Sequence, residues 1–169
     1  MNIEQIRALV TQKCGQPPQP QDVAALSEFV DVATHPDVRD YLRHCLPSET
    51  YLASQIRVLP WETIGREMGE GSAPGSFIRP FGYLIVATSI GGNALCLHQT
   101  TGRVFWADHD SFSDDMVMFQ NRTTRSWEYL YEYTAANVER AMVPISETFE
   151  SFLTALLTDQ LTAQLDALD

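Results

Sequence analysis

The sequence predicts a single α+β domain with a central, mainly antiparallel twisted sheet, N-terminal helices and a C-terminal helix packed on that sheet. Three observations predict it: short strands separated by glycine turns between Phe81 and Phe112, apolar residues at helical spacing near the N-terminus, and a long amphipathic stretch near the C-terminus. A chain of 169 residues with 44% hydrophobic content suits one domain that buries roughly 70% of its unfolded surface. We expect a helical region at 1–47, a sheet region at 54–135 and the last helix at 146–168.

Three short helices are expected in the N-terminal region, each ended by glycine or proline. The first stops near Gly15, before a proline-rich segment. Asp22 is the expected N-cap of the second helix, which Pro36 blocks. The third is expected from Pro36 to Leu46, with proline in its first turn.

The middle of the chain is expected to form the sheet. Residues 54–61 have the apolar and β-branched content of a strand, and 65–75, with four glycines, is expected to be a flexible surface loop. The unbroken apolar run 83–87 predicts a central strand covered on both faces. Glycine turns at Gly92 and Gly102 then predict two further antiparallel strands.

The last third is expected to contain an exposed connection, an aromatic strand and the final helix. Residues 113–125 are interpreted as the exposed connection. Trp127, Tyr129, Tyr131 and Tyr133 recur with period two, which favours a strand, although the spacing of the intervening glutamates leaves a helix open. Ser146 is the expected N-cap of the final helix.

The charge is strongly negative, with 22 acidic and 11 basic residues, a formal net charge of −11 and a pI near 4.6. Residues 104–169 hold twelve acidic residues and three basic ones, Arg122, Arg125 and Arg140. Direct binding to nucleic acid or to anionic lipid is therefore disfavoured, and a basic partner is favoured. An acidic surface that serves solubility alone is the alternative.

The cysteines and the N-terminus favour a soluble, cytoplasmic protein. Cys14, Cys45 and Cys96 are an odd number at wide spacings, which fits neither a disulfide framework nor a metal-binding pair. The first residues lack the apolar core of a secretory signal, and no apolar run approaches the ~20 residues that span a bilayer.

No motif predicts an enzyme, a cofactor or a metal centre. The 65–75 loop has no lysine to grip a phosphate, no serine stands in a nucleophile elbow, and no two histidines share a helical face at zinc spacing. Asp108 and Asp110 are expected on one face of a strand end with His109 on the other, near Asp114 and Asp115. A solvated acidic rim is favoured over a divalent-cation site, because an EF-hand glutamate is missing.

The order of these turns and strands resembles the SUKH superfamily, which includes the fungal Smi/Knr cell-wall regulators. The resemblance covers at most residues 81–157, and the chain looks like a divergent member because its N-terminal third lacks the helix pattern of the family. The residues that carry it are Gly92, Asn93, Leu97, Gly102, Val104, Phe105, Asp108, His109, Ser146, Phe149, Phe152 and Leu153. The resemblance implies turn and core roles for these residues and a fold more than a function.

Bacterial relatives in that superfamily commonly act as immunity proteins, so the resemblance implies a non-enzymatic protein that neutralises a cognate toxin, often a nuclease. The acidic charge agrees, because a nuclease is basic where it grips its substrate. The expected contact surface is both acidic and aromatic. It consists of Asp108, His109, Asp110, Asp114, Asp115, Trp127, Tyr129, Tyr131 and Tyr133.

Two other functions stay open on the sequence. One is a regulatory scaffold that binds an endogenous protein in a cell-wall or signalling assembly, as the fungal members imply. The other is a small hydrolase that uses Asp108, His109 and Asp110 with a metal ion.

Overall fold

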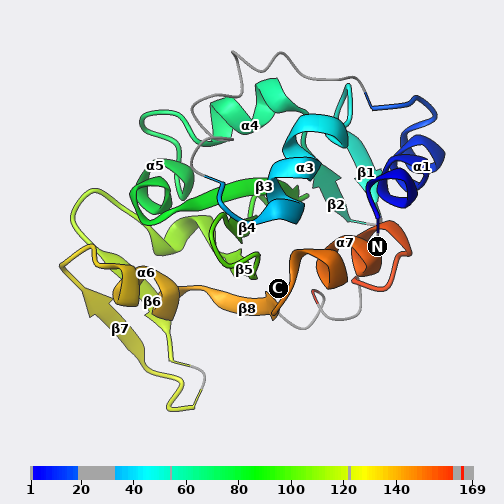
Figure 1. The fold of residues 1–169 in the computed structure, drawn as a ribbon. Coiled ribbons are helices and arrows are strands. Elements are labelled where there is room, and N and C mark those ends of the chain that lie inside the picture. The colour runs from blue at the N-terminus through cyan, green and yellow to red at the C-terminus, as the bar shows by residue number, and fades with distance from the viewer. Residues whose placement is uncertain (1, 19–32, 54, 122, 162–164, 166–169) are drawn as a thin grey trace.

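A six-stranded antiparallel sheet with the order β1-β2-β3-β4-β5-β8 forms the centre of the fold (Figure 1). The computed structural model describes residues 2–18, 33–53, 55–121, 123–161 and 165. Every strand pair in these residues is antiparallel, as the sequence predicts. The strands of the sheet are β1 (Tyr51–Ala53), β2 (Ile56–Val58), β3 (Tyr83–Ser89), β4 (Ala94–His98), β5 (Val104–Ala107) and β8 (Val143–Ser146).

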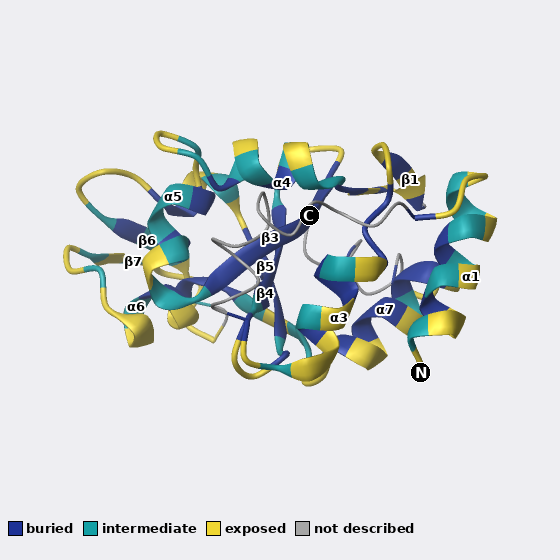
Figure 2. Cartoon of the chain, turned by 45° about the horizontal axis from the view of Figure 1, so that its top comes forward, coloured by how far each residue is buried: buried dark blue, intermediate teal, exposed yellow. Residues whose placement is uncertain are grey.

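A separate hairpin of β6 (Val117–Gln120) and β7 (Trp127–Leu130) lies at the end of the molecule opposite to the first helix (Figures 1 and 2). Six α-helices fall within the described residues, and helices before and after the sheet confirm the α+β class. They are α1 (Ile3–Cys14), α3 (Pro36–His44), α4 (Trp61–Glu67), α5 (Gly75–Ile78), α6 (Ala135–Ala141) and α7 (Phe149–Leu157), with 3₁₀ turns η1 (Arg79–Phe81) and η2 (His109–Ser111).

The core lies around the middle strands. All seven residues of β3 are buried, which confirms the central strand. Its hairpin to β4 turns at Gly92, where φ is 97°, a backbone conformation that glycine adopts without a steric penalty. Figure 2 shows β3, β4 and β5 as buried strands, whereas the chain around β6 and β7 is partly exposed.

The helices α1, α3 and α7 pack against one another at the other end of the molecule. Asn2 closes a capping box at the start of α1, and Gly15 ends it in the left-handed conformation, as expected. The Pro36–His44 helix is confirmed with Val38, Tyr41 and Leu42 buried. The helix expected from Asp22 lies outside the described residues.

The strand expected within 54–61 is present as β2, with Ile56 and Val58 both buried, but it is shorter than expected because Trp61 already begins α4. Its partner β1 was not predicted. One prediction in this part of the chain is wrong. The 65–75 segment is not a loop throughout, since α4 runs to Glu67 and α5 begins at Gly75. Met68 fixes this segment to the sheet, because its sulfur accepts the N–H of Ile85 at 3.3 Å.

The chain after β5 also differs from the prediction. The expected exposed connection, 113–125, contains β6, and Val117 is fully buried. Ser146 ends β8, and the cap of α7 is Thr148, whose hydroxyl accepts the N–H of Ser151 at 3.2 Å. The sequence analysis did not predict α6 or β8. Proline in β8 is compatible with a strand because β8 is the edge of the sheet.

Candidate functional site

The β6–β7 hairpin displays its side chains on two different faces. Residues that are directly opposite in the register share a face, and so do alternate residues along a strand. One face contains Val117, Phe119, Glu128 and Leu130 and includes the fully buried Val117. The opposite face, which we call the hairpin face, consists of Met118, Gln120, Trp127 and Tyr129.

Large aromatic side chains are exposed on and next to the hairpin face. Trp127 is 54% exposed and Tyr129 is 50% exposed. Tyr131, one residue beyond β7, is 73% exposed. The β7 strand confirms the period-two interpretation for 127–130, whereas Tyr131 and Tyr133 lie beyond the strand. Exposed aromatic residues gathered in this way are typical of protein contact surfaces.

Tyr133 differs from the other three aromatic residues of the predicted surface. Its ring stacks on Phe77 at 5.5 Å between centroids, and its hydroxyl donates to the carbonyl oxygens of Ser113 (2.7 Å) and Met116 (3.1 Å). Burial raises the pKa of Tyr133, and the Asp114 carboxylate acts in the same direction. Tyr133 therefore holds the 113–116 loop in place.

Four exposed carboxylates stand on the chain that leads to the hairpin. We call Asp108, Asp110, Asp114 and Asp115 the acidic rim; all four are exposed. The loop that carries Asp114 and Asp115 leads directly into β6, and Tyr133 holds that loop in place. The structure thus brings both halves of the predicted surface to the same end of the molecule.

The geometry expected for Asp108, His109 and Asp110 is wrong. They do not continue a strand, because β5 ends at Ala107 and His109–Ser111 form a 3₁₀ turn. Asp108 caps this turn, with its Oδ1 accepting the Asp110 N–H at 3.0 Å. A short polar side chain that caps its own turn is a common local arrangement.

The His109 ring is held between two protein oxygens. Its Nδ1 is 3.1 Å from Asn93 Oδ1, and its Nε2 is 3.3 Å from Asp110 Oδ1. Both ring nitrogens are engaged, which is not the arrangement of an open metal ligand. Within the described ranges, no group of three or more His, Cys, Asp or Glu side chains has metal-binding geometry.

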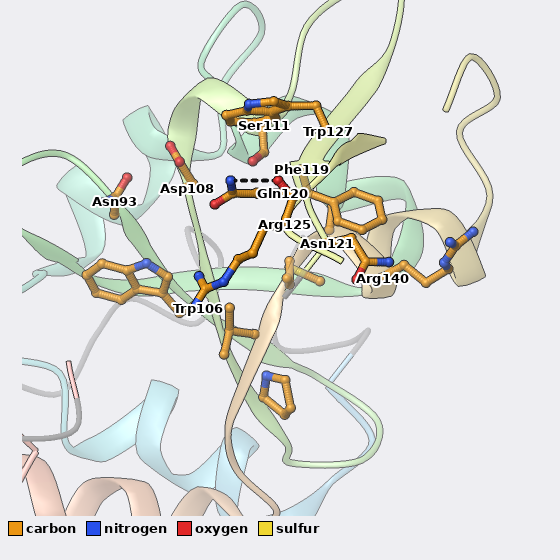
Figure 3. A pocket seen from close by; sticks show the side chains of 14 residues that line it. Asn93, Trp106, Asp108, Ser111, Phe119, Gln120, Asn121, Arg125, Trp127 and Arg140 are labelled. Atoms are coloured by element: carbon orange, nitrogen blue, oxygen red, sulfur yellow. Dashed lines mark hydrogen bonds between the residues drawn. The ribbon is translucent and has the colours of Figure 1, made fainter. Parts of the chain in front are cut away.

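A cleft of about 610 Å³ opens between the hairpin and the edge of the main sheet (Figure 3). Its aromatic walls are Trp106 from β5, Phe119 from β6 and Trp127 from β7. Asp108 stands at its rim, so the acidic rim and the hairpin face meet there. The remaining lining residues are Asn93, Ser111, Gln120, Asn121, Arg125, Arg140, Ala141, Met142, Val143 and Pro144.

No pattern in the sequence predicts this cleft. Arg125 and Arg140, two of the three basic residues among the last 66 residues of an acidic chain, both line it. Basic residues are rare in this half of the sequence, and that rarity is the feature by which the two arginines could have been singled out. Arg140 binds the Glu128 carboxylate at 2.6 Å and lies over the Phe119 ring at 5.6 Å, so it fastens α6 to the hairpin.

The three thiols are not activated nucleophiles. Cys45 and Cys96 are fully buried and Cys14 is half-buried. Burial raises the pKa of Cys14 to about 11, with Glu49 adding to the effect, and burial raises the pKa of Cys45 to about 12. The pKa of Cys96 is also raised, by burial alone.

We expect the native protein to react slowly with a thiol-specific disulfide reagent at pH 8, because the thiolate is the attacking species. The rate should rise with pH toward 11 as Cys14 ionises. All three thiols should react rapidly after unfolding in guanidinium. A native thiol that reacts within seconds at pH 8 would contradict this assignment.

Comparison with family models, with curated proteins and with solved structures finds no match to this chain. The SUKH resemblance therefore stays a prediction from the sequence. No helix in the described residues is both long enough and apolar enough to cross a membrane.

Proposed function

We propose that this chain is a non-enzymatic immunity protein that binds and neutralises a basic protein toxin through the hairpin face and the acidic rim. One observation carries the proposal: Trp127, Tyr129 and Tyr131 are each at least half exposed on and beside a projecting hairpin. Tryptophan and tyrosine are the residues that most often dominate binding energy at protein interfaces.

Charge supports a basic partner. The acidic rim adds four exposed carboxylates beside the aromatic side chains, in a chain with a formal net charge of −11. Complementary charge accelerates association and selects against partners of the same sign. The nuclease toxins that the SUKH resemblance implies carry basic substrate-binding surfaces.

The proposal is tested by co-expressing this chain with the proteins encoded by neighbouring genes and identifying a toxin that it neutralises. We expect growth to be restored and the two proteins to purify as a complex. Trp127→Ala and Tyr129→Ala should each weaken binding by roughly 30-fold, which is the effect of losing about 2 kcal/mol at an interface hot spot. Titration calorimetry measures the change.

Leu52→Ala is the matched control for these variants, because Leu52 is 58% exposed on β1, away from the hairpin. It should bind as the unchanged protein does. Asp114→Asn with Asp115→Asn should lower the association rate and flatten its salt dependence. The proposal would be wrong if this chain neither protects cells from the toxin nor forms a complex with it.

A regulatory scaffold would give a different result in the same system. Affinity purification from native lysate would then recover several constitutive proteins, and the neighbouring toxin would not be among them. That outcome would replace the immunity function with the scaffold function implied by the fungal members.

A further inference from the structure

The cleft beside the hairpin contains an arginine, Arg125, that the proposed function leaves unused. We infer that the cleft, which shares Trp127 and Asp108 with the proposed toxin surface, binds a small aromatic anion, a molecule that joins a flat ring to a carboxylate or phosphate group. The site's volume of about 610 Å³ is within the range of small-molecule sites. The inference does not depend on a protein partner.

Arg125 is the cation that would hold the anionic group. Its side chain runs from the hairpin turn into the cleft, toward Trp106 (Figure 3). The other cleft arginine, Arg140, is already neutralised by Glu128. Arg125 makes no ion pair with any described residue, so its guanidinium is available for a bidentate contact with a carboxylate or phosphate.

The backbone around Arg125 is fixed in an unusual conformation. Arg125 has φ of 58°, in the left-handed region that non-glycine residues rarely adopt. Its N–H donates to the Asn121 carbonyl at 2.7 Å, and its carbonyl accepts the Gln120 amide at 3.1 Å (Figure 3). These bonds fix the Arg125 backbone at the turn from which its side chain enters the cleft, and a preorganised group binds with a smaller entropic penalty.

Two further donors and one exposed ring complete the site. The Ser111 hydroxyl and the Trp106 indole N–H line the cleft, and neither makes a hydrogen bond to another described residue. Trp127, which is 54% exposed, offers a ring surface for stacking on a flat ligand, whereas Trp106 is 3% exposed and contributes only a small part of the wall. Asp108, at the rim, is placed to accept a hydrogen bond from a hydroxyl or amino group of the ligand.

The acidic character of the whole chain does not prevent anion binding in the cleft. Asp108 is the one acidic residue among the described residues that line the cleft, and because charges are screened over about 8 Å at physiological ionic strength, carboxylates beyond the cleft act weakly on a ligand inside it. A direct guanidinium contact is a charge-assisted hydrogen bond and acts at full strength. The local donors therefore decide which ligand binds.

The three tryptophans allow a specific test, because Trp106 and Trp127 line the cleft whereas Trp61 lies in α4. The full chain is titrated with adenosine 5′-monophosphate and with indole-3-acetate while its indole N–H resonances are followed by NMR. We expect at least one of these anions to shift the Trp106 and Trp127 signals with saturation. The Trp61 signal should stay in place. Adding inorganic phosphate or acetate as competitor then distinguishes a phosphate from a carboxylate ligand.

Matched probes and variants separate the ring from the charge. Adenosine and indole, which lack the anionic group, should bind at least tenfold more weakly than the anions. Arg125→Gln should weaken anion binding by roughly 10- to 100-fold, the effect of losing a charged hydrogen bond. Arg57→Gln, the same change at an exposed arginine of β2, should have no effect.

Three results would each overturn the inference: neither anion shifts the cleft tryptophans, the neutral rings bind as tightly as the anions, or Arg57→Gln weakens binding as much as Arg125→Gln. None of them bears on the toxin complex. Loss of the toxin complex in turn leaves the small-molecule titration unaffected, so the two proposals fail independently.

Discussion

Replacing Gly75 by alanine is expected to destabilise the protein by about 3 kcal/mol or more, at the upper end of overpacking effects. A Cβ at this position would lie 1.8 Å from the Glu67 carbonyl oxygen and 2.8 Å from its carbonyl carbon. Both atoms belong to the backbone, so no side-chain rotation relieves the clash. The end of α4 and the start of α5 would have to move apart. Thermal unfolding should show a midpoint lowered by at least roughly 6 °C.

Gly65→Ala is the internal control for this prediction. Gly65 lies within α4, and a Cβ there would meet no atom within 4 Å. Alanine in a helix interior is favoured over glycine by roughly 0.5–1 kcal/mol, so this variant should be slightly more stable. If Gly75→Ala unfolds at the same temperature as Gly65→Ala, the close approach of α5 to the end of α4 is wrong.

Replacing Phe149 by alanine is expected to destabilise the protein by about 3–5 kcal/mol, as for other buried phenylalanines. Phe149 is fully buried at the start of α7. Its ring meets Tyr41 of α3 edge-on at 5.0 Å and lies 6.1 Å from the Phe152 ring. The substitution leaves a cavity where α3 and α7 meet. Denaturant titration gives the free energy of unfolding directly.

Tyr131→Ala provides the comparison, because Tyr131 is 73% exposed and its loss should change stability by no more than about 0.5 kcal/mol. A loss below about 1 kcal/mol for Phe149→Ala would mean that α7 does not pack on α3 as described. The two variants also separate the role of a core residue in stability from the role of a surface residue in binding, because only Tyr131 lies beside the hairpin face.

The parts of the fold that the sequence predicts correctly are those in which local pattern and burial agree. The apolar run of β3 requires cover on both faces, and the structure buries every residue of that strand. The Gly15 stop of α1 and the Gly92 turn follow from conformations that glycine adopts easily. These signals act within a few residues, so the sequence alone reveals them.

The errors occur where long-range contacts decide the structure. The apolar run 116–119 is short and lies between polar residues, and the burial of Val117 at the base of the hairpin makes 113–125 part of the fold. Pro144 discourages the prediction of a strand, although an edge strand accommodates it. Ser146 resembles a helix cap locally, but pairing with Val104 places it in the sheet.

The sequence predicts which residues contribute to the candidate site but not how those residues are arranged. The acidic and aromatic residues that the pattern selected do lie at one end of the molecule, but Tyr133 and Asp108 stabilise turns there. The cleft was missed because its lining comes from β5, β6, β7 and α6, which are brought together only by the fold. No pattern in the sequence indicates that the Arg125 side chain points into the cleft.

Hydrogen exchange on the toxin complex tests the central claim most directly, because it locates the contact surface without mutation. We expect strong protection of 117–131 and of the acidic-rim segment 108–115 on binding, with no change in α1 and β1 at the other end of the molecule. The predicted result is therefore a footprint confined to the hairpin and the acidic rim. A stable complex that protects α1 and β1 and leaves 117–131 unchanged would contradict the account.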